Sequence, residues 1–219
     1  MKDVIIIGAS GHGAEIHEYI LAHEKLTGQK EFRIVGLLDE KKEYYERYAY
    51  TAPFLGPITG HTVNKNVWYI IAIANIKIRK MVVEDFLSSG ARFTSFFHPT
   101  AYISSSAKIG NGVVIGPNAN IGPNAVVGDF CLINSRCSIA HDSVLGSFNC
   151  LSPNVCLSGS TTIGNGNFFG INSATLQGVT IGDFNIIQAG MIIDQDIGNE
   201  STIFYRFKEK VIAIPRKIE

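Results

Sequence analysis

Residues 113–130 have the sequence VVIGPNANIGPNAVVGDF, which is three six-residue units placed end to end. The same period runs from residue 101 to residue 196, as sixteen consecutive units. The third residue of each unit is apolar, with Thr175 as the one exception. At an apolar content of 46%, chance would give such a column on the order of once in ten thousand trials. The period therefore describes a structural repeat.

A period of six matches neither the 3.6 residues of a helical turn nor the two-residue alternation of an ordinary strand. It matches a short strand followed by a corner. Side chains alternate across a strand, so the first and third residues of each unit are predicted to point inward. The fourth residue is mostly Gly, Ser or Asn and is predicted to turn the corner. Three units would close a triangular coil of eighteen residues, as in hexapeptide parallel β-helices.

The repeat contains a single histidine, His141, within SIAHDSVLG (138–146), and Asp142 follows it directly. His141 is the fifth residue of its unit, so we expect it at a corner, facing outward. Gly159 is the equivalent residue one coil later and should leave open space beside the ring. Imidazole changes protonation near neutral pH, which makes an exposed imidazole beside a carboxylate a candidate general base. A solvated corner residue is the alternative interpretation.

The first hundred residues alternate between predicted strands and helices. The segment DVIIIGASGHGAEIHEYILAHEK predicts a buried strand, a glycine turn and an amphipathic helix. FRIVGLLDE, VWYIIAIAN and ARFTSFF predict three more strands, with a helix at about residues 76–88 between the last two. This alternation is typical of a small parallel, Rossmann-like α/β domain. We therefore expect an α/β domain over residues 1–98 and an all-β, β-helical domain with a C-terminal extension over residues 99–219.

The glycine turn GASGHG, residues 8–13, has the spacing G-x-x-G-x-G, which differs from the dinucleotide fingerprint G-x-G-x-x-G. Glycines after a strand still let backbone N–H groups approach a phosphate at a helix N-terminus. Asp39 ends the second strand and is placed to accept hydrogen bonds from a ribose or a base. The sequence favours a mononucleotide or nucleotide-sugar site, and a purely structural turn is the alternative.

Composition excludes several classes of function. Nineteen basic and nineteen acidic residues give a net charge of zero, which argues against nucleic-acid or anionic-membrane binding. No apolar run is long enough to span a membrane, and the first residues predict a strand and no signal peptide, so we expect a cytoplasmic protein. The four cysteines lack Cys-x-x-Cys spacing and His141 is the only histidine of the repeat, so no metal site is expected.

A short α/β domain that opens with GASGHG, followed by coils that contain IAHD and VLGSF, resembles the bacterial nucleotide-sugar acetyltransferases of the left-handed β-helix superfamily. These include the UDP-4-amino-sugar N-acetyltransferases and the sialic-acid O-acetyltransferases. The resemblance implies a homotrimer that binds acetyl-CoA between neighbouring β-helices and holds a nucleotide-linked amino sugar in its N-terminal domain. It predicts acetylation of an amino-deoxy sugar, such as a 4-amino-4,6-dideoxyhexose, for surface-glycan biosynthesis. Sialic-acid O-acetylation and non-catalytic nucleotide-sugar binding are the alternatives.

The resemblance also assigns residues. His141 is the expected general base, and Asp142 is its acidic partner. The residues expected to bind the nucleotide sugar are Gly8, Ser10, Gly11, His12, Gly13, Asp39, Glu40, Asn75 and Asn134. Those expected to bind acetyl-CoA are Cys150, Gly159, Gly170, Ile171, Ala189, Gly190 and Lys217. Cys150 departs from the family pattern, because many relatives have a second histidine there.

Overall fold

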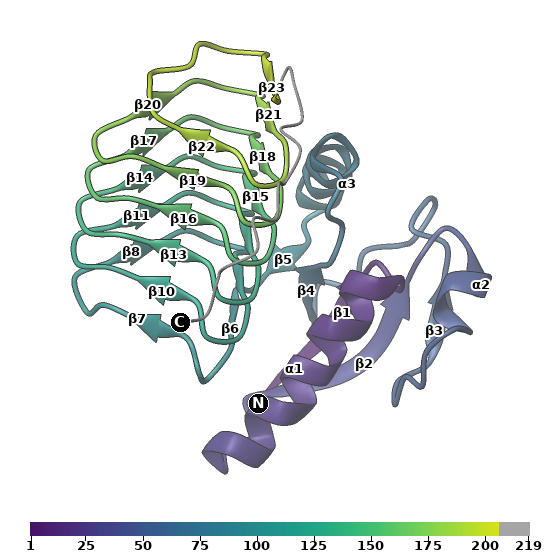
Figure 1. Ribbon diagram of the computed structural model, residues 1–219. Helices are drawn as coiled ribbons and strands as arrows, with labels where there is room; N and C mark the ends of the chain where they lie inside the picture. The colour runs from purple at the N-terminus through teal and green to yellow at the C-terminus, as the bar shows by residue number, and fades with distance from the viewer. Residues whose placement is uncertain (206–219) are drawn as a thin grey trace, which may run out of the picture.

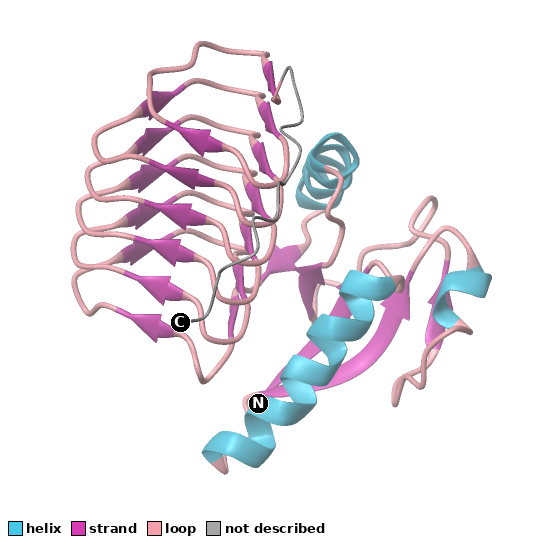
Figure 2. Cartoon of the chain, viewed as in Figure 1, coloured by secondary structure: helices cyan, strands magenta, loops and turns pink. Residues whose placement is uncertain are grey.

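The N-terminal part of the chain is a five-stranded parallel sheet, sheet A, with strand order β3-β2-β1-β4-β5 (Figures 1 and 2). The computed structural model describes residues 1–205. The strands of sheet A are β1 (Lys2–Ile7), β2 (Phe32–Leu38), β3 (Phe54–Gly56), β4 (Trp68–Ile71) and β5 (Arg92–Phe93). The helices are α1 (Gly11–Thr27), α2 (Lys42–Tyr45) and α3 (Ile76–Ser88). The predicted strand–helix alternation is confirmed, whereas β3 and α2 carried no clear sequence signal.

The continuous apolar run of β1 is explained by burial on both faces of sheet A. Val4 and Ile6 pack in a cluster with α1, whereas Ile5 and Ile7 pack in a second cluster with α3. This is the environment of a central parallel strand. The helices α1 and α3 therefore cover opposite faces of the sheet. The glycine turn follows β1, so it lies at the edge formed by the carboxyl ends of the strands, between these two helices.

The C-terminal part is the predicted left-handed parallel β-helix, with three sheets that form the faces of a triangular prism (Figure 1). Sheet B contains β6 (Phe96–Phe97), β9 (Val114–Ile115), β12 (Leu132–Ile133), β15 (Cys150–Leu151), β18 (Phe168–Phe169), β21 (Ile186–Ile187) and β23 (Thr202–Ile203). Sheet C contains β7 (Tyr102–Ile103), β10 (Asn120–Ile121), β13 (Ser138–Ile139), β16 (Cys156–Leu157), β19 (Ala174–Thr175) and β22 (Ile192–Ile193). Sheet D contains β8 (Lys108–Ile109), β11 (Val126–Val127), β14 (Val144–Leu145), β17 (Thr162–Ile163) and β20 (Thr180–Ile181).

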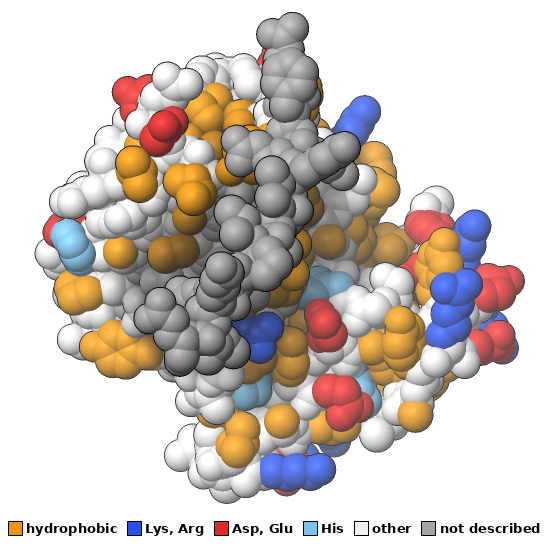
Figure 3. Space-filling view, viewed as in Figure 1, with side chains coloured by type: hydrophobic (Ala, Val, Ile, Leu, Met, Phe, Trp, Pro, Cys, Tyr) orange, Lys and Arg blue, Asp and Glu red, His pale blue; other side chains and the backbone are white. Residues whose placement is uncertain are grey.

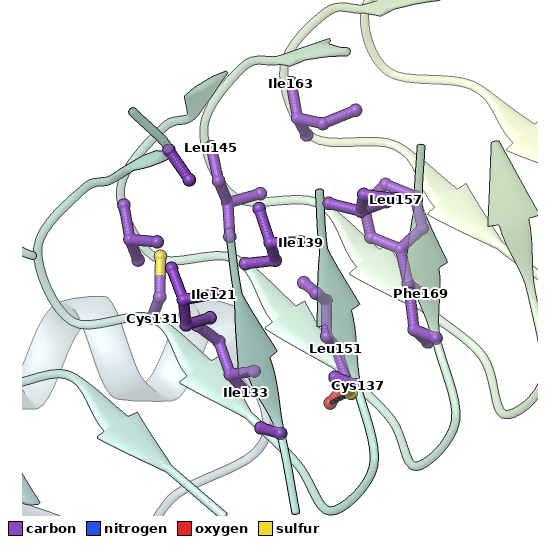
Figure 4. Packing of buried hydrophobic residues seen from close by; sticks show 14 of the residues in the cluster. Ile121, Cys131, Ile133, Cys137, Ile139, Leu145, Leu151, Leu157, Ile163 and Phe169 are labelled. Atoms are coloured by element: carbon purple, nitrogen blue, oxygen red, sulfur yellow. Dashed lines mark hydrogen bonds between the residues drawn. The ribbon is translucent and has the colours of Figure 1, made fainter. Parts of the chain in front are cut away.

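The inside of the prism is filled by the first and third residues of the six-residue units, as predicted. Ile121 and Ile139 stack on sheet C, Ile133, Leu151 and Phe169 stack on sheet B, and all five belong to one buried cluster (Figure 4). Paired residues of successive coils are eighteen positions apart, as for Ile121 and Ile139 in sheet C. The hydrophobic cluster is therefore continuous along the axis of the β-helix.

The corners differ from the prediction. Between residues 112 and 190, the sixth residue of each unit has positive φ, as in Asn124 (φ 59°) and Asp142 (φ 58°), and the fourth does not. Glycine at the fourth position has another cause, which is the close stacking of coils. A Cβ on Gly122 would lie 2.8 Å from the backbone nitrogen of His141 in the next coil. Glycine at such fourth positions is therefore explained by the close approach of the neighbouring backbone.

Sheet B packs against the α/β domain. Val114, Leu132 and Cys150 project outward from sheet B into the cluster that contains Val4 and Ile6. The segment ARFTSFF, predicted as one strand, is divided between the domains: β5 joins sheet A, and β6 begins sheet B. The proposed division at residues 98 and 99 falls just after β6. No helix in residues 1–205 has the length and apolarity needed to cross a membrane.

Candidate active site

His141 and Asp142 form a hydrogen-bonded pair at the corner where β13 of sheet C leads into β14 of sheet D. The His141 Nδ1 atom lies 2.8 Å from Asp142 Oδ2, and the His141 side chain is 55% exposed. The left-handed backbone at Asp142 (φ 58°) turns its carboxylate back toward the preceding ring. Two adjacent residues, which would diverge in a strand, are thereby brought into contact.

Asn124 extends this pair by one residue and lies one coil earlier. Its Nδ2 atom donates to Asp142 Oδ1 at 2.9 Å, so both carboxylate oxygens have a partner. The hydrogen bonds from Asn124 and then from His141 lower the pKa of Asp142, which keeps it ionised. Sequence reasoning missed Asn124. The eighteen-residue spacing to Asp142 is the signal that could have identified it, because stacked corners are eighteen residues apart.

The His141 ring lies over Gly159 of the next coil. A Cβ on Gly159 would come within 2.7 Å of both Cε1 and Nε2 of His141, so the ring occupies the space that the sequence was expected to leave open. Within residues 1–205, Nε2 has no hydrogen-bond partner. A ring whose Nδ1 proton is held by a carboxylate presents Nε2 as a proton acceptor. The pair therefore has the arrangement of an oriented general base.

The glycine turn connects β1 to α1, and its backbone is tightly packed. Gly8 has φ 107°, and a Cβ there would lie 2.8 Å from the carbonyl oxygen of Ala72, at the end of β4. A Cβ on Gly13 would collide with the carbonyl oxygen of Gly8. The hydroxyl of Ser10, the N-cap residue of α1, makes no capping hydrogen bond. The first turn of α1 therefore presents backbone N–H groups and a small hydroxyl, which suits a phosphate.

Asp39 and Glu40 follow β2 and hold the loops around this turn. Asp39 is 8% exposed, and its Oδ2 accepts from the Ala9 N–H at 2.7 Å. Glu40 accepts from the backbone N–H and the hydroxyl of Thr59 at 2.9 and 2.8 Å. Tyr50, which sequence reasoning missed, donates to the Ala9 carbonyl at 2.9 Å. One oxygen of Asp39 is thus committed to the turn itself.

His12 lies at the start of α1, with Nδ1 at 3.2 Å from Glu15 Oε2. Its Nε2 atom is buried and has no hydrogen-bond partner in the described part of the chain. Burial of a polar nitrogen without a partner is unfavourable by about 1–3 kcal/mol. His12 is therefore a polar group at the start of α1 that a ligand could satisfy.

A cleft of about 720 Å³ lies between α3 and the β-helix. Asn75, the N-cap residue of α3, lies at its rim, and its Oδ1 accepts from the Ile78 N–H at 3.0 Å. The other lining side chains are apolar, basic, acidic and amide groups from both domains: Ile76, Lys77, Lys80, Met81 and Glu84 from α3, with Phe168, Phe184, Asn185 and Ile186 from the β-helix. The cleft begins two residues beyond Ala72, which contacts Gly8 of the glycine turn.

The remaining residues singled out from the sequence occupy different parts of the β-helix. The corners between sheets B and C carry Asn134, Gly170, Ile171, Ala189 and Gly190, which therefore share one edge of the prism. Gly159 lies with His141 on the edge between sheets C and D. Cys150 is 5% exposed, on the outward face of sheet B against the α/β domain, so it has a packing position away from both edges. Lys217 lies outside the described residues.

Within residues 1–205, no group of three or more His, Cys, Asp or Glu side chains is placed to hold a metal ion. The cysteine thiols of the β-helix interior are hydrogen-bonded to backbone carbonyls, as for Cys131 and Cys137. Burial raises the pKa of both thiols to about 12, which keeps them protonated. These cysteines therefore serve as small buried side chains.

Comparison with known proteins shows similarity in sequence to one domain family and one curated enzyme. Residues 3–86 match the PglD N-terminal domain family. UDP-N-acetylbacillosamine N-acetyltransferase of Bacillus subtilis (strain 168) is 33% identical over 116 residues, which are 52% of this chain and 51% of that protein. The matched segment thus spans about half the length of this curated relative.

Two solved structures share the fold over nearly the whole chain. The acetyltransferase domain of PglB from Neisseria gonorrhoeae FA1090, in complex with acetyl coenzyme A, superposes with a TM-score of 0.78 at 27% identity, covering 91% of this chain and 96% of that one. PerB from Caulobacter crescentus, in complex with CoA and GDP-perosamine, gives 0.76 at 23% identity, covering 92% and 93%, which shows the shared fold. Residues 3–86 thus match the PglD N-terminal domain family, and the chain over nearly its whole length is similar to the acetyltransferase domain of PglB.

Proposed function

We propose that this chain transfers the acetyl group of acetyl-CoA to the amino group of a nucleotide-linked amino-deoxy sugar, with His141 as the general base. The observation that carries the proposal is the exposed imidazole whose Nδ1 is held by Asp142 and whose Nε2 has no partner among residues 1–205. The names of the two most informative relatives support the reaction class: one is an N-acetyltransferase of a UDP-sugar, and the other is an acetyltransferase domain in complex with acetyl coenzyme A.

The chemistry follows from the arrangement of this pair. The sugar amine attacks the thioester carbonyl carbon, a C–N bond forms, and the C–S bond breaks. His141 Nε2 accepts the proton that the amine loses, and the imidazolium can return it to the departing thiolate. Asp142 stabilises the imidazolium and fixes the tautomer in which Nδ1 carries a proton. General-base assistance of this kind contributes about 10²–10⁴-fold to a rate.

The α/β domain is the proposed site for the nucleotide sugar. The first turn of α1, with Ser10 and His12, would bind the diphosphate through backbone N–H groups and the unpartnered His12 Nε2. Gly8 contacts Ala72, which places the turn close to the start of the cleft at Ala74 and Asn75. The cleft has the mixed apolar and polar lining typical of small-ligand sites, and we assign it to the sugar.

The active enzyme is proposed to be a homotrimer in which neighbouring chains complete each site. The α/β domain packs on sheet B, whereas His141 lies on the edge between sheets C and D, opposite that face. A sugar held near α3 is therefore remote from the His141 of its own chain. Large apolar side chains are exposed on sheets C and D and their edges (Figure 3), namely Tyr102, Val144, Ile171, Leu176 and Ile192. A second copy of this chain is the occupant that we propose for this surface.

The test is thiol release from acetyl-CoA in the presence of UDP-, dTDP- and GDP-linked amino sugars and of free sialic acid. We expect one amino-sugar nucleotide to be acetylated, with a product that resists mild alkali, because an amide survives conditions that cleave an ester. His141→Ala should lower kcat/KM by at least about 10²-fold while thermal unfolding stays unchanged, since the side chain is exposed. Acetylation of sialic acid alone, or near-normal turnover by His141→Ala, would contradict the proposal.

A further inference from the structure

Arg79 of α3 is a charged side chain with no exposed surface, placed where the two domains meet. It is 0% exposed, the largest side chain among those that are fully buried. Its Nη1 atom donates to the carbonyls of Ile73 at 2.9 Å and Ala74 at 3.1 Å. Its Nη2 atom donates to the carbonyls of Phe148 at 2.7 Å and Asn149 at 3.2 Å. Nη1 therefore donates to the α/β domain, and Nη2 donates to the β-helix.

The environment of Arg79 is unusual for a buried cation. No Asp or Glu among residues 1–205 forms an ion pair with it, and its Nε atom has no hydrogen-bond partner. The thiol of Cys150 lies beside the guanidinium, and burial raises the pKa of that thiol, so it supplies no negative charge. Burying a charge without a counter-charge is costly even when carbonyls accept its hydrogen bonds. This cost is offset by the hydrogen bonds to four backbone carbonyls, which an apolar side chain of similar length would leave without these donors, so the charge is explained by what it joins.

The two carbonyl pairs belong to the two walls of the cleft. Ile73 and Ala74 immediately precede Asn75, which lines the cleft at the start of α3. Phe148 and Asn149 form the turn that enters β15, and Cys150 of that strand pairs with Phe168, a lining residue of the opposite wall. The planar guanidinium fixes the separation of its two nitrogens, and with it the separation of these backbone segments.

We propose that Arg79 is a positioning residue that sets the width of the cleft and the placement of Asn75 for the acceptor sugar. The part of this inference that concerns the sugar rests on the proposed function. The part that concerns the backbone does not, because it follows from the four hydrogen bonds to carbonyls. A lysine at this position has one nitrogen and cannot hold both segments at the same separation.

The variants are Arg79→Lys, which keeps the charge, and Arg79→Met, which keeps the length without donors. Arg33→Lys is the matched control, because Arg33 is exposed and pairs with Asp3 in the same domain. Two quantities are measured on the full chain. The first is hydrogen–deuterium exchange of peptides that cover residues 72–78 and 147–151. The second is KM for the amino-sugar nucleotide and for acetyl-CoA, each with the other substrate saturating.

We expect Arg79→Lys to speed exchange in both peptides while exchange around β17 is unchanged. KM for the sugar nucleotide should rise by about tenfold or more, with KM for acetyl-CoA within about twofold, because a small misplacement at a distance can cost up to about 10²-fold. Equal changes in both KM values, or exchange like that of Arg33→Lys, would overturn the proposal. If Arg79→Met does not fold, the lysine variant decides. If the wild type acetylates no amino sugar, the proposed function fails while the exchange data still test the role of Arg79 in the backbone.

Discussion

The position of the His141 ring depends on the absence of a side chain at Gly159. Gly159 does not have a positive φ, so alanine is compatible with its backbone, but a Cβ would come within 2.7 Å of Cε1 and Nε2 of His141. Gly159→Ala should therefore displace the ring from its hydrogen bond with Asp142 while the coil stays folded. We expect kcat/KM to fall by about 10²-fold, as for loss of the base itself, with little change in Tm.

Gly198→Ala is the matched control for this variant, since a Cβ at Gly198 meets open space among the described residues and its φ is not positive. It should retain the activity and the Tm of the wild type. A Gly159→Ala enzyme with wild-type kcat/KM would show that the ring position observed here is not the one used in catalysis.

A second residue-scale prediction concerns His17 and acid stability. His17 is 1% exposed on α1, and its Nε2 accepts the Thr51 N–H at 3.1 Å, which requires a neutral ring. Burial lowers the pKa of His17 from its ordinary value of 6.5, more than the hydrogen bond with Glu18 raises it. The unfolded chain therefore binds the proton first as the pH falls below 6.5, and stability is lost from there down to the lowered folded pKa.

This loss can be at most about 1.4 kcal/mol per pH unit for one proton. Urea unfolding between about pH 8 and pH 5 measures it directly. His17→Gln keeps an acceptor for Thr51 without a titrating ring, so its stability should depend less on pH over this range. If the free energy of unfolding of His17→Gln falls with pH as steeply as that of the wild type, His17 is excluded as the source of the acid sensitivity.

At the scale of residues, the sequence was informative where a titratable side chain is rare among its neighbours. The repeat of small and apolar residues contains a single histidine followed directly by an aspartate, and this predicted that the two side chains act together. The structure shows the hydrogen bond between them. Asn124 was not predicted, because asparagine is common at these corners and only the stacking of coils gives this one a partner. Cys150 was expected near acetyl-CoA from the family resemblance, because many relatives have a second histidine at its position. It lies on the outward face of sheet B, whereas His141 lies on the edge between sheets C and D.

At the scale of elements, a ladder of buried asparagines supports the turns that enter sheet B. The Asn167 N–H donates to Asn149 Oδ1 at 2.7 Å, and the Asn185 N–H donates to Asn167 Oδ1 at 2.8 Å. All three side chains are fully buried. Asn167→Ala would leave the Asn185 N–H without its partner in a buried site. We expect a loss of about 1–3 kcal/mol in the free energy of unfolding, measured by urea denaturation.

The matched control is Asn120→Ala, which removes an asparagine from the outward side of sheet C. Its Nδ2 makes one long hydrogen bond, 3.4 Å, to Ser138. Such a half-exposed substitution should change stability by no more than about 0.5 kcal/mol. If the two substitutions lower the free energy of unfolding equally, the buried hydrogen bonds of the ladder do not contribute to stability.

The elements also show where periodicity suffices and where it does not. The apolar third position predicted the β-helix because strand alternation requires it in every coil. The role of the fourth-position glycines was wrong, since the positive φ lies at the sixth position and coil stacking explains the fourth. The short strand β3 has three residues and one neighbour, β2, and so lacks a pattern long enough to detect. The division of ARFTSFF depends on contacts with distant residues, which a local pattern does not contain.

At the scale of the whole molecule, the residues singled out from the sequence are separated by the thickness of the β-helix. The α/β domain packs on the sheet B side, away from the edge between β13 and β14 (Figure 1). The glycine turn and the cleft belong to the first side, and His141 belongs to that edge. A residue pattern places each group within its own unit but contains no information on a second chain. The family resemblance predicted a trimer, and the separation within one chain gives that prediction a physical reason.

Complementation between two inactive variants tests this arrangement. His141→Ala lacks the base, and Gly11→Val obstructs the first turn of α1, where a Cβ already lies 3.4 Å from the Tyr48 hydroxyl. If each site combines the glycine turn of one chain with the His141 of its neighbour, a random one-to-one mixture has both intact groups in about a quarter of its sites. Purification through two different tags removes the homo-oligomers, and each remaining mixed trimer has one intact site in three, so the co-expressed variants should regain about a third of wild-type activity, whereas each variant alone stays inactive. Mixed oligomers without activity would place the turn and the base of each site in the same chain, and the intersubunit arrangement would be wrong.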